Sequence, residues 1–193
     1  MKKHFYFLLV FLIAISELNI QNIKAQSVSK QLVFTKAMID EKTSQVWFEV
    51  FNPSDESMTL SSFRISGVKS PNILPADIRR NNGIVLNYGE RLIICGDKQS
   101  FENAYENNSK IVEIEALKNI GDGGFVAINY MNGIENAGNI IRFGDRSNSL
   151  QVSNKVGDDQ LLSVTNDGLC FAREINSDGE LSSWAKINPT PGK

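Results

Sequence analysis

The chain has 193 residues, of which 41% are hydrophobic, 22% charged and 9% aromatic, and its formal net charge is −2. These proportions are typical of a soluble globular domain, and they exclude a collagen, a disordered polyampholyte and a multi-span membrane protein. At about 100–200 residues per domain, the length accommodates one domain with a substantial core.

The N-terminus has the order of a secretory signal peptide. Basic residues follow Met1, an apolar run covers 5–15 apart from Tyr6, and the small residue Ala25 stands at the expected cleavage point. The run is too short for a membrane-spanning helix, which needs about 20 apolar residues. The alternative is a retained N-terminal anchor helix. We favour cleavage, and therefore expect no stable membrane insertion after residues 1–25 are removed.

The expected mature protein is one exported domain, secreted or periplasmic. Residues 26–30 would form a short tail and residues 31–193 the domain. Cleavage removes His4, the only histidine, together with three lysines and one glutamate, so the net charge changes from −2 to −4. A chain without histidine excludes imidazole-dependent triads and histidine-bearing zinc sites. A mildly acidic chain without a basic cluster also makes nucleic acid an unsuitable partner.

The segment 45–51 has the clearest strand pattern. Apolar residues alternate with polar ones in steps of two, as in a half-buried strand. We expect Phe48 and Val50 to fill the space between two sheets and Glu49 to face outward. Pro53 then ends the strand, because proline has no backbone donor for pairing.

The remainder of 31–193 consists of short strand patterns separated by turn residues, with Asn-Gly and Asp-Gly pairs marking several turns. The further expected strands are 32–38, 58–65, 83–86, 91–95, 111–117, 125–130, 139–143, 161–164 and 169–175. One stretch, 97–107, favours a short helix, with Asp97 as its cap and Phe101 and Tyr105 on one face. The pattern predicts an all-β fold, an antiparallel sandwich or barrel with one short helix in a loop.

Several segments, in order, resemble the lamin tail domain family. WFEVFNP at 47–53 is similar to the strand and turn W-I-E-L-Y-N-P, LNYGERLII at 86–94 to L-x-P-G-e-x-l-v-i, and the closing Trp184 and PTPG to the terminal W…P-T-P-G. The stretches LVFTKAM at 32–38, MTLSSFRI at 58–65 and NIGDGGF at 119–125 also resemble the family's segments. Lys36, Phe63 and Tyr88 depart from the family's usual glutamate, tryptophan and proline.

The resemblance covers nearly all of 31–193 and implies an immunoglobulin-like β-sandwich. It also implies an accessory or interaction module, since exported bacterial members are often attached to hydrolases or other surface modules. The family carries no catalytic residues that could be transferred to this chain. For Trp47 and Trp184 we favour packing over a ligand-stacking role.

Two cysteines, Cys95 and Cys170, leave two alternatives open. In an exported protein an even number of cysteines favours a disulfide. A bridge here would close a loop of 75 residues, and such a loop stabilises by about 4 kcal/mol. The other alternative is two buried thiols that act as small apolar residues, because each cysteine adjoins an apolar run.

Two further site hypotheses depend on carboxylates. Glu113 and Glu115 alternate with apolar residues, so they would share one strand face, either as the acid pair of a glycosidase or as a solvated outer face. Acidic glycine loops at 121–123, 144–145, 157–159, 166–168 and 176–180 are rich in oxygen ligands and could hold calcium, the one cofactor considered. The same pairs are ordinary turn chemistry.

From the sequence we therefore expect a non-catalytic interaction module that recognises a protein or glycan at or near the cell surface. The alternatives are a small carboxylate-based hydrolase and a carbohydrate-binding module. An exposed apolar patch would favour a protein partner, and an aligned row of exposed aromatic residues would favour a glycan.

Overall fold

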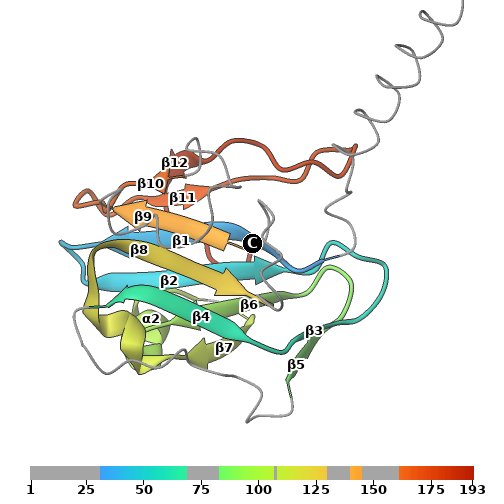
Figure 1. Cartoon of the computed structure of the whole chain (residues 1–193), viewed down its shortest axis with the longest axis horizontal. Helices are drawn as coiled ribbons and strands as arrows, with labels where there is room; N and C mark the ends of the chain where they lie inside the picture. The colour runs from blue at the N-terminus through green and yellow to red at the C-terminus, as the bar shows by residue number, and fades with distance from the viewer. Residues whose placement is uncertain (1–30, 69–82, 107, 130–139, 145–160) are drawn as a thin grey trace, which may run out of the picture.

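The structure is a computed structural model of the chain, and it describes residues 31–68, 83–106, 108–129, 140–144 and 161–193. These residues form two layers of strands (Figure 1), so the predicted all-β fold is confirmed. Two neighbouring strand pairs are parallel, β6 with β7 and β9 with β10, and the sandwich is therefore mixed instead of purely antiparallel. The expected signal peptide and tail, residues 1–30, lie outside the described residues.

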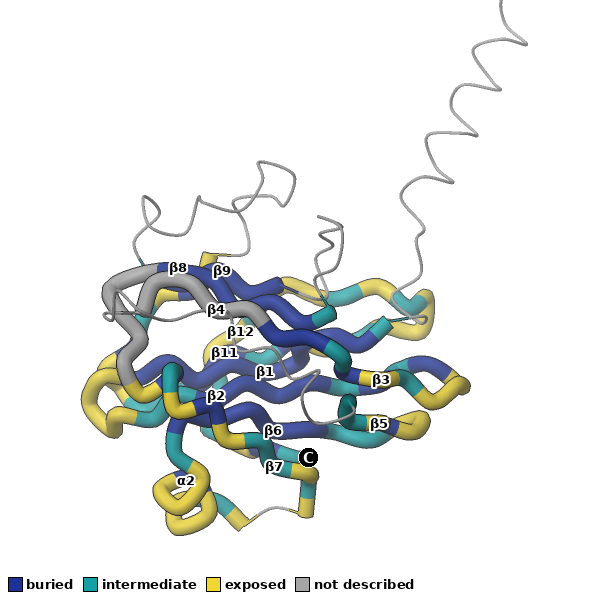
Figure 2. The backbone as a smooth tube through the Cα atoms, turned by 60° about the horizontal axis from the view of Figure 1, so that its bottom comes forward, coloured by how far each residue is buried: buried dark blue, intermediate teal, exposed yellow. Residues whose placement is uncertain are grey.

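The larger sheet has six strands in the order β12-β11-β1-β2-β6-β7. Their bounds are β1 Val33–Asp40, β2 Gln45–Phe51, β6 Arg91–Cys95, β7 Lys110–Glu113, β11 Cys170–Ala172 and β12 Ala185–Ile187. The central strands β1, β2 and β6 are buried along most of their length (Figure 2). Such burial requires cover on both faces of this sheet.

The smaller sheet covers the inner face. It has four strands in the order β10-β9-β8-β4, and a separate pair joins β3 to β5. The bounds are β3 Met58–Leu60, β4 Phe63–Val68, β5 Ile84–Leu86, β8 Ile120–Ile128, β9 Ile140–Gly144 and β10 Leu161–Leu162. Phe48 and Val50 of β2 lie in the main core with Phe63, Val126 and Phe143 of the smaller sheet. The prediction that Phe48 and Val50 fill the space between the sheets is thus confirmed.

Several predicted strand boundaries differ from those in the structure. The bounds of β2 and β6 match the prediction, whereas the single strand expected at 58–65 is two strands that belong to different sheets. The strand expected at 111–117 ends at Glu113, and a 3-10 helix, η3, follows over Glu115–Asn119. The edge strand β12 was not expected from the sequence, because it is short and Ala185 and Lys186 are exposed.

A short helix and its flanking residues cover part of the outer face of the larger sheet. The helix α2 spans Lys98–Ala104, and the Asp97 side chain accepts the Ser100 N–H as its N-cap, as predicted. Phe101 and Tyr105 pack against Trp47, with ring centroids 5.9 and 5.8 Å from that of the tryptophan. Trp47 is fully buried in this cluster, so its role is packing, as we favoured.

Cys95 and Cys170 also belong to the cluster around Trp47, and both are buried free thiols in the structure. Cys95 is on β6 and Cys170 on β11, with β1 and β2 between them in the sheet. Three strand spacings amount to about 14 Å, whereas a disulfide joins Cα atoms less than about 7 Å apart. The structure therefore has the second of the two alternatives, in which each cysteine fills apolar space.

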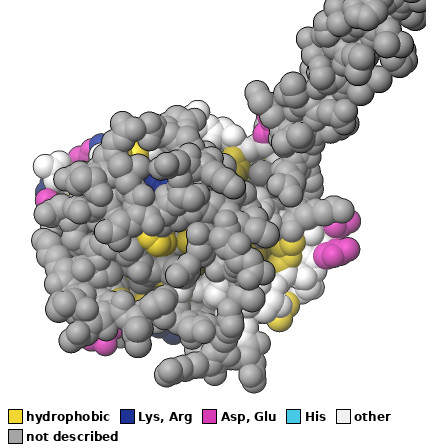
Figure 3. All heavy atoms as spheres, in the orientation of Figure 1, with side chains coloured by type: hydrophobic (Ala, Val, Ile, Leu, Met, Phe, Trp, Pro, Cys, Tyr) yellow, Lys and Arg dark blue, Asp and Glu magenta, His cyan; other side chains and the backbone are white. Residues whose placement is uncertain are grey.

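Little large apolar surface remains exposed on the described residues. Val85, Tyr88 and Leu161 are the large hydrophobic residues classed as exposed among them. On the face of the molecule seen in Figure 3, the described hydrophobic side chains reach the surface only in small separate patches. Among the described residues, therefore, exposed large hydrophobic side chains are few.

Candidate functional site

A bulge in β1 brings two polar side chains opposite one glutamate. Phe34 pairs with Val50, and the next pair in register is Lys36 with Glu49, so Thr35 is an extra residue on β1. A β-bulge places two residues opposite one and turns their side chains toward it. The Thr35 hydroxyl donates to Glu49 Oε1 at 2.7 Å, and Lys36 Nζ donates to Oε2 at 3.2 Å.

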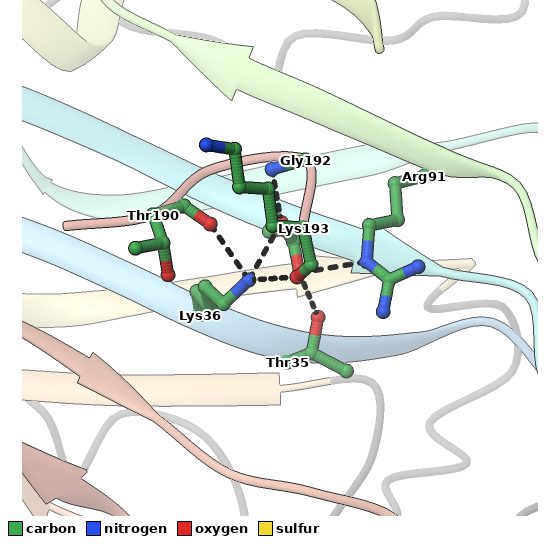
Figure 4. A network of polar contacts seen from close by, with 7 residues as sticks. Thr35, Lys36, Arg91, Thr190, Gly192 and Lys193 are labelled. Carbon is green, nitrogen blue, oxygen red and sulfur yellow. Dashed lines mark hydrogen bonds and ion pairs between the residues drawn. The ribbon is translucent and has the colours of Figure 1, made fainter. Parts of the chain in front are cut away.

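Two further donors complete the shell around this carboxylate (Figure 4). Arg91 Nε, from the neighbouring strand β6, donates to Glu49 Oε1 at 3.3 Å. The Gly192 N–H, from the C-terminal segment, donates to Oε2 at 2.7 Å. Each oxygen therefore receives two donors, and Glu49 has no exposed surface.

Glu49 faces outward from the sheet, as predicted, but facing outward does not expose it. Its side chain lies on the face opposite Phe48 and Val50, and residues 190–193 cross that face (Figure 4). Burying a carboxylate is tolerated only when it is paired and hydrogen-bonded. The shell around Glu49 meets this condition.

Lys36 binds the same C-terminal segment through its main-chain oxygens. Its Nζ donates to the Thr190 carbonyl oxygen at 2.9 Å and to the main-chain oxygen of Lys193 at 2.6 Å. Lys36 is only 8% exposed although it is a lysine. Lys36 thus binds carbonyl oxygens of the C-terminal segment, and Glu49 binds one of its N–H groups.

A groove of about 540 Å³ lies beside this network on the outer face of the larger sheet. Its charged lining residues are Lys36, Glu49, Arg91, Arg173, Glu174 and Lys193. Four of these are basic and two acidic, whereas the whole chain has a net charge of −2. The groove is therefore a basic site on an acidic protein.

Arg173 supplies a buried positive charge at one side of the groove. It is 4% exposed, its Nε donates to the Phe34 carbonyl oxygen at 2.9 Å, and its guanidinium lies 4.3 Å from the centre of the Trp184 ring. Burial lowers the pKa of Arg173 to about 9, which leaves the side chain cationic at neutral pH. Trp184 therefore packs under an arginine, in agreement with the packing role we favoured.

A second groove, also about 540 Å³, is lined in part by the same C-terminal segment. Glu102, Tyr105 and Glu106, in and after α2, line it together with Pro191 and Gly192. The segment thus lines both a basic groove and an acidic one. The acidic groove contains two glutamates and one terminal lysine as its charged lining residues.

A second buried carboxylate, Asp40, joins the end of β1 to a distant turn. It accepts the Thr43 N–H at 2.8 Å, the Thr165 hydroxyl at 2.9 Å and the Gly168 N–H at 2.8 Å. Burial opposes ionisation of Asp40, but these hydrogen bonds outweigh it and lower its pKa below the usual value. Asp40 thus fastens its own turn to the distant turn at 165–168, which is a structural role.

The acid pair expected at Glu113 and Glu115 does not form on one strand face. β7 ends at Glu113, and Glu115 begins the 3-10 helix η3, so the alternation that would align them is broken. Both residues are exposed, and Glu113 Oε1 lies 3.6 Å from Lys118 Nζ. The prediction of a shared strand face is wrong.

Two of the acidic glycine loops, 166–168 and 176–180, are ordinary bends or turns with hydrogen bonds of their own, whereas 121–123 lies within strand β8 and is no loop. Asn176 Oδ1 accepts the N–H groups of Asp178 and Glu180, and Asp167 forms an ion pair with Lys186 at 2.9 Å. Within the described ranges, no group of three or more histidine, cysteine, aspartate or glutamate side chains is placed to hold a metal ion. The 157–159 loop, and Asp145 of the 144–145 loop, lie outside those ranges.

Sequence reasoning missed the network around Glu49. The available signal was one glutamate inside the apolar stretch 46–51, with one lysine inside the apolar stretch 32–39 before it. Two opposite charges within adjacent buried strands predict a pair, because an unpaired charge there would cost several kcal/mol. No such signal indicated that residues 190–193 would cover them.

Comparison with family models, curated proteins and solved structures finds no match for the chain. Within the part of the chain that the structure describes, no helix is long and apolar enough to cross a membrane.

Proposed function

We propose that the mature protein is an exported, non-catalytic binding module that recognises a protein or glycan at or near the cell surface, with the basic groove as its ligand site. The observation that carries this proposal is the groove itself, in which Lys36 and Arg91 are held by a buried carboxylate on a sheet. Side chains fixed in this way lose little entropy when a ligand binds. The signal-like N-terminus supports export, and the lamin-tail-like segments support an immunoglobulin-like interaction module.

The state of Glu49 favours binding over hydrolysis. A carboxylate-based hydrolase needs one acid to deliver a proton and another to activate water or attack the substrate. Each carboxylate oxygen of Glu49 already accepts two hydrogen bonds, and the donors are Thr35, Lys36, Arg91 and Gly192. A carboxylate in this environment anchors its neighbours and has no oxygen directed at a substrate.

The test is binding of the purified mature protein to a glycan array and to purified surface proteins of the source cell. Arg91→Gln removes one charge from the groove, and Lys98→Gln removes one from the exposed surface of α2 as a matched control. Binding that is lost only in Arg91→Gln supports the proposal. Equal binding by both variants would refute the groove as the site, and cleavage of an arrayed glycan would refute a non-catalytic role.

Export has a separate test. The intact mass of the protein recovered from the producing cells should correspond to a chain that begins at Gln26. A mass that retains residues 1–25, with the protein in the membrane fraction, would instead indicate the anchor helix.

A further inference from the structure

We propose that the basic groove binds an extended acidic peptide segment of a partner protein, with a ligand carboxylate on Arg91. This inference rests on the proposed function, since it specifies the ligand of the same site. Three observations support it: the positive charge of the groove, the backbone hydrogen bonds between the Glu49 network and residues 190–193, and the arginine side chains that cover the nearby aromatic rings.

The charge argument concerns the outer end of Arg91. Its Nε is used by Glu49, and its two terminal nitrogens have no hydrogen-bond partner among the described residues. A guanidinium presents its terminal nitrogens as a fork that fits a carboxylate. Because Glu49 is already neutralised by Lys36, a second carboxylate on Arg91 restores the charge balance of the groove instead of adding to an acidic site.

The main-chain argument comes from the C-terminal segment. Lys36 donates to the carbonyl oxygen of Thr190, and Glu49 accepts the N–H of Gly192, so this face already holds a peptide turn by its backbone. The held segment forms one wall of the groove, since Thr190 and Lys193 line it. A ligand peptide in the groove would therefore lie beside this turn, and Arg91 would offer it donors that the turn does not use.

The aromatic rings at the groove favour a peptide over a glycan. Sugar rings bind through stacking on exposed aromatic faces, but Phe51 lies under the Arg91 guanidinium, 4.6 Å from it. Trp184 lies under Arg173 in the same way, at 4.3 Å. Apolar contacts are instead offered by Ile175 and Ile187, which suit the aliphatic side chains of a peptide.

The dimensions set the length of the segment. The groove extends from Arg91 on β6 to Ile187 on β12, and these strands are four positions apart in the sheet order. At about 4.8 Å per strand and about 3.3 Å per extended residue, this distance corresponds to about six residues. Alternate side chains of such a segment point the same way, so acidic and aliphatic residues can reach different walls.

The experiment measures fluorescence anisotropy of a labelled peptide of three Ile-Glu repeats with the purified mature protein. The matched peptide has Gln in place of each Glu, and trigalacturonate serves as an acidic glycan, measured by calorimetry. We expect the Glu peptide to bind roughly tenfold to a hundredfold more tightly than the Gln peptide, the range for a charge-assisted hydrogen bond. Raising the salt from about 0.05 to about 0.5 M should weaken the Glu peptide only.

Two variants assign the effect to the groove. Arg91→Gln should abolish the preference for the Glu peptide, and Lys98→Gln, which removes a charge from α2, should retain it. The peptide comparison and the salt dependence use the wild-type protein, so they remain decisive if Arg91→Gln folds poorly.

Equal affinity for the Glu and Gln peptides, or no binding at about 1 mM peptide, would overturn the inference. Binding of trigalacturonate that depends on Arg91, without binding of the peptide, would overturn the inference and leave the proposed binding module standing. Preference for the Glu peptide that survives Arg91→Gln would place the site elsewhere and overturn it as well.

Discussion

Replacement of Glu49 by glutamine tests whether the buried network holds the outer face together. Oε1 receives Thr35 Oγ1 and Arg91 Nε, and Oε2 receives Lys36 Nζ and the Gly192 N–H. A glutamine has one oxygen and one NH₂ group, so either orientation places a donor against a cation. The Thr35 hydroxyl can turn and accept from the NH₂, whereas neither cation can accept.

The expected loss follows from what remains unpaired. Lys36 keeps the main-chain oxygens of Thr190 and Lys193 but loses its counter-ion at a site where its side chain is 10% exposed. Breaking a buried ion pair by removing one partner typically costs about 3–5 kcal/mol. Since a domain is stable by about 5–15 kcal/mol, Glu49→Gln should remove a large part of the free energy of unfolding.

Urea denaturation followed by tryptophan fluorescence measures this loss, because Trp47 is fully buried and adjoins the network through β2. The matched control is Glu90→Gln, which removes a carboxylate paired with Lys110 at 2.7 Å on the exposed surface. Exposed pairs contribute little, so the control should denature at nearly the wild-type urea concentration. A midpoint for Glu49→Gln as high as that of the control would refute the reasoning.

The remaining predictions concern the outer cluster and Asp40. Burial raises the pKa of Cys95 to about 12 and that of Cys170 to about 11. A thiol-reactive dye should therefore label neither cysteine in the native protein and both cysteines after denaturation without reductant. If only one thiol or none is labelled after denaturation, the cysteines are not both free. The pKa of Asp40 is lower in the folded protein than in the unfolded chain, where it is about 3.9. The ionised Asp40 therefore stabilises the fold above this pH, and the stabilisation is lost as the pH falls through the folded pKa. The difference in urea midpoint between wild type and Asp40→Asn should therefore narrow below about pH 4, and a constant difference would contradict this. Phe101→Ala should lower the free energy of unfolding by about 3–5 kcal/mol, because the ring fills a fully buried site. It should also shift the fluorescence emission of Trp47 to the red, because the Phe101 ring packs against that tryptophan. Unchanged emission would show that α2 does not keep water away from Trp47.

Local patterns predicted the elements whose burial alternates along the chain. In β2 the alternation of Phe48 and Val50 with Glu49 identified the strand, its bounds and its inner face. In α2 the spacing of Phe101 and Tyr105, together with the Asp97 cap, identified the helix and its apolar side. These signals are local, because they depend only on the period of the element and on its termini.

Features that depend on distant residues could not be predicted in this way. Glu49 is buried because Gly192, 143 positions later, lies over it, and no pattern within β2 indicates such a cover. The segment 58–65 has one continuous strand pattern, but it is divided because its two halves pair with β5 and β8 in different sheets. The sheet order likewise separates Cys95 from Cys170, although the apolar runs around both are alike.

The network around Glu49 also shows why stability and recognition are linked on this face. An apolar replacement of a buried ion pair is often neutral or stabilising, so stability alone does not require Lys36 and Glu49. What an apolar pair could not do is hold the N–H of Gly192, the carbonyl oxygen of Thr190 and the Nε of Arg91 at once. Because Glu49 engages Arg91 only through Nε, the terminal nitrogens are held toward the groove before any ligand arrives. The carboxylate that fixes the C-terminal segment therefore also presets the cation that we propose binds the ligand.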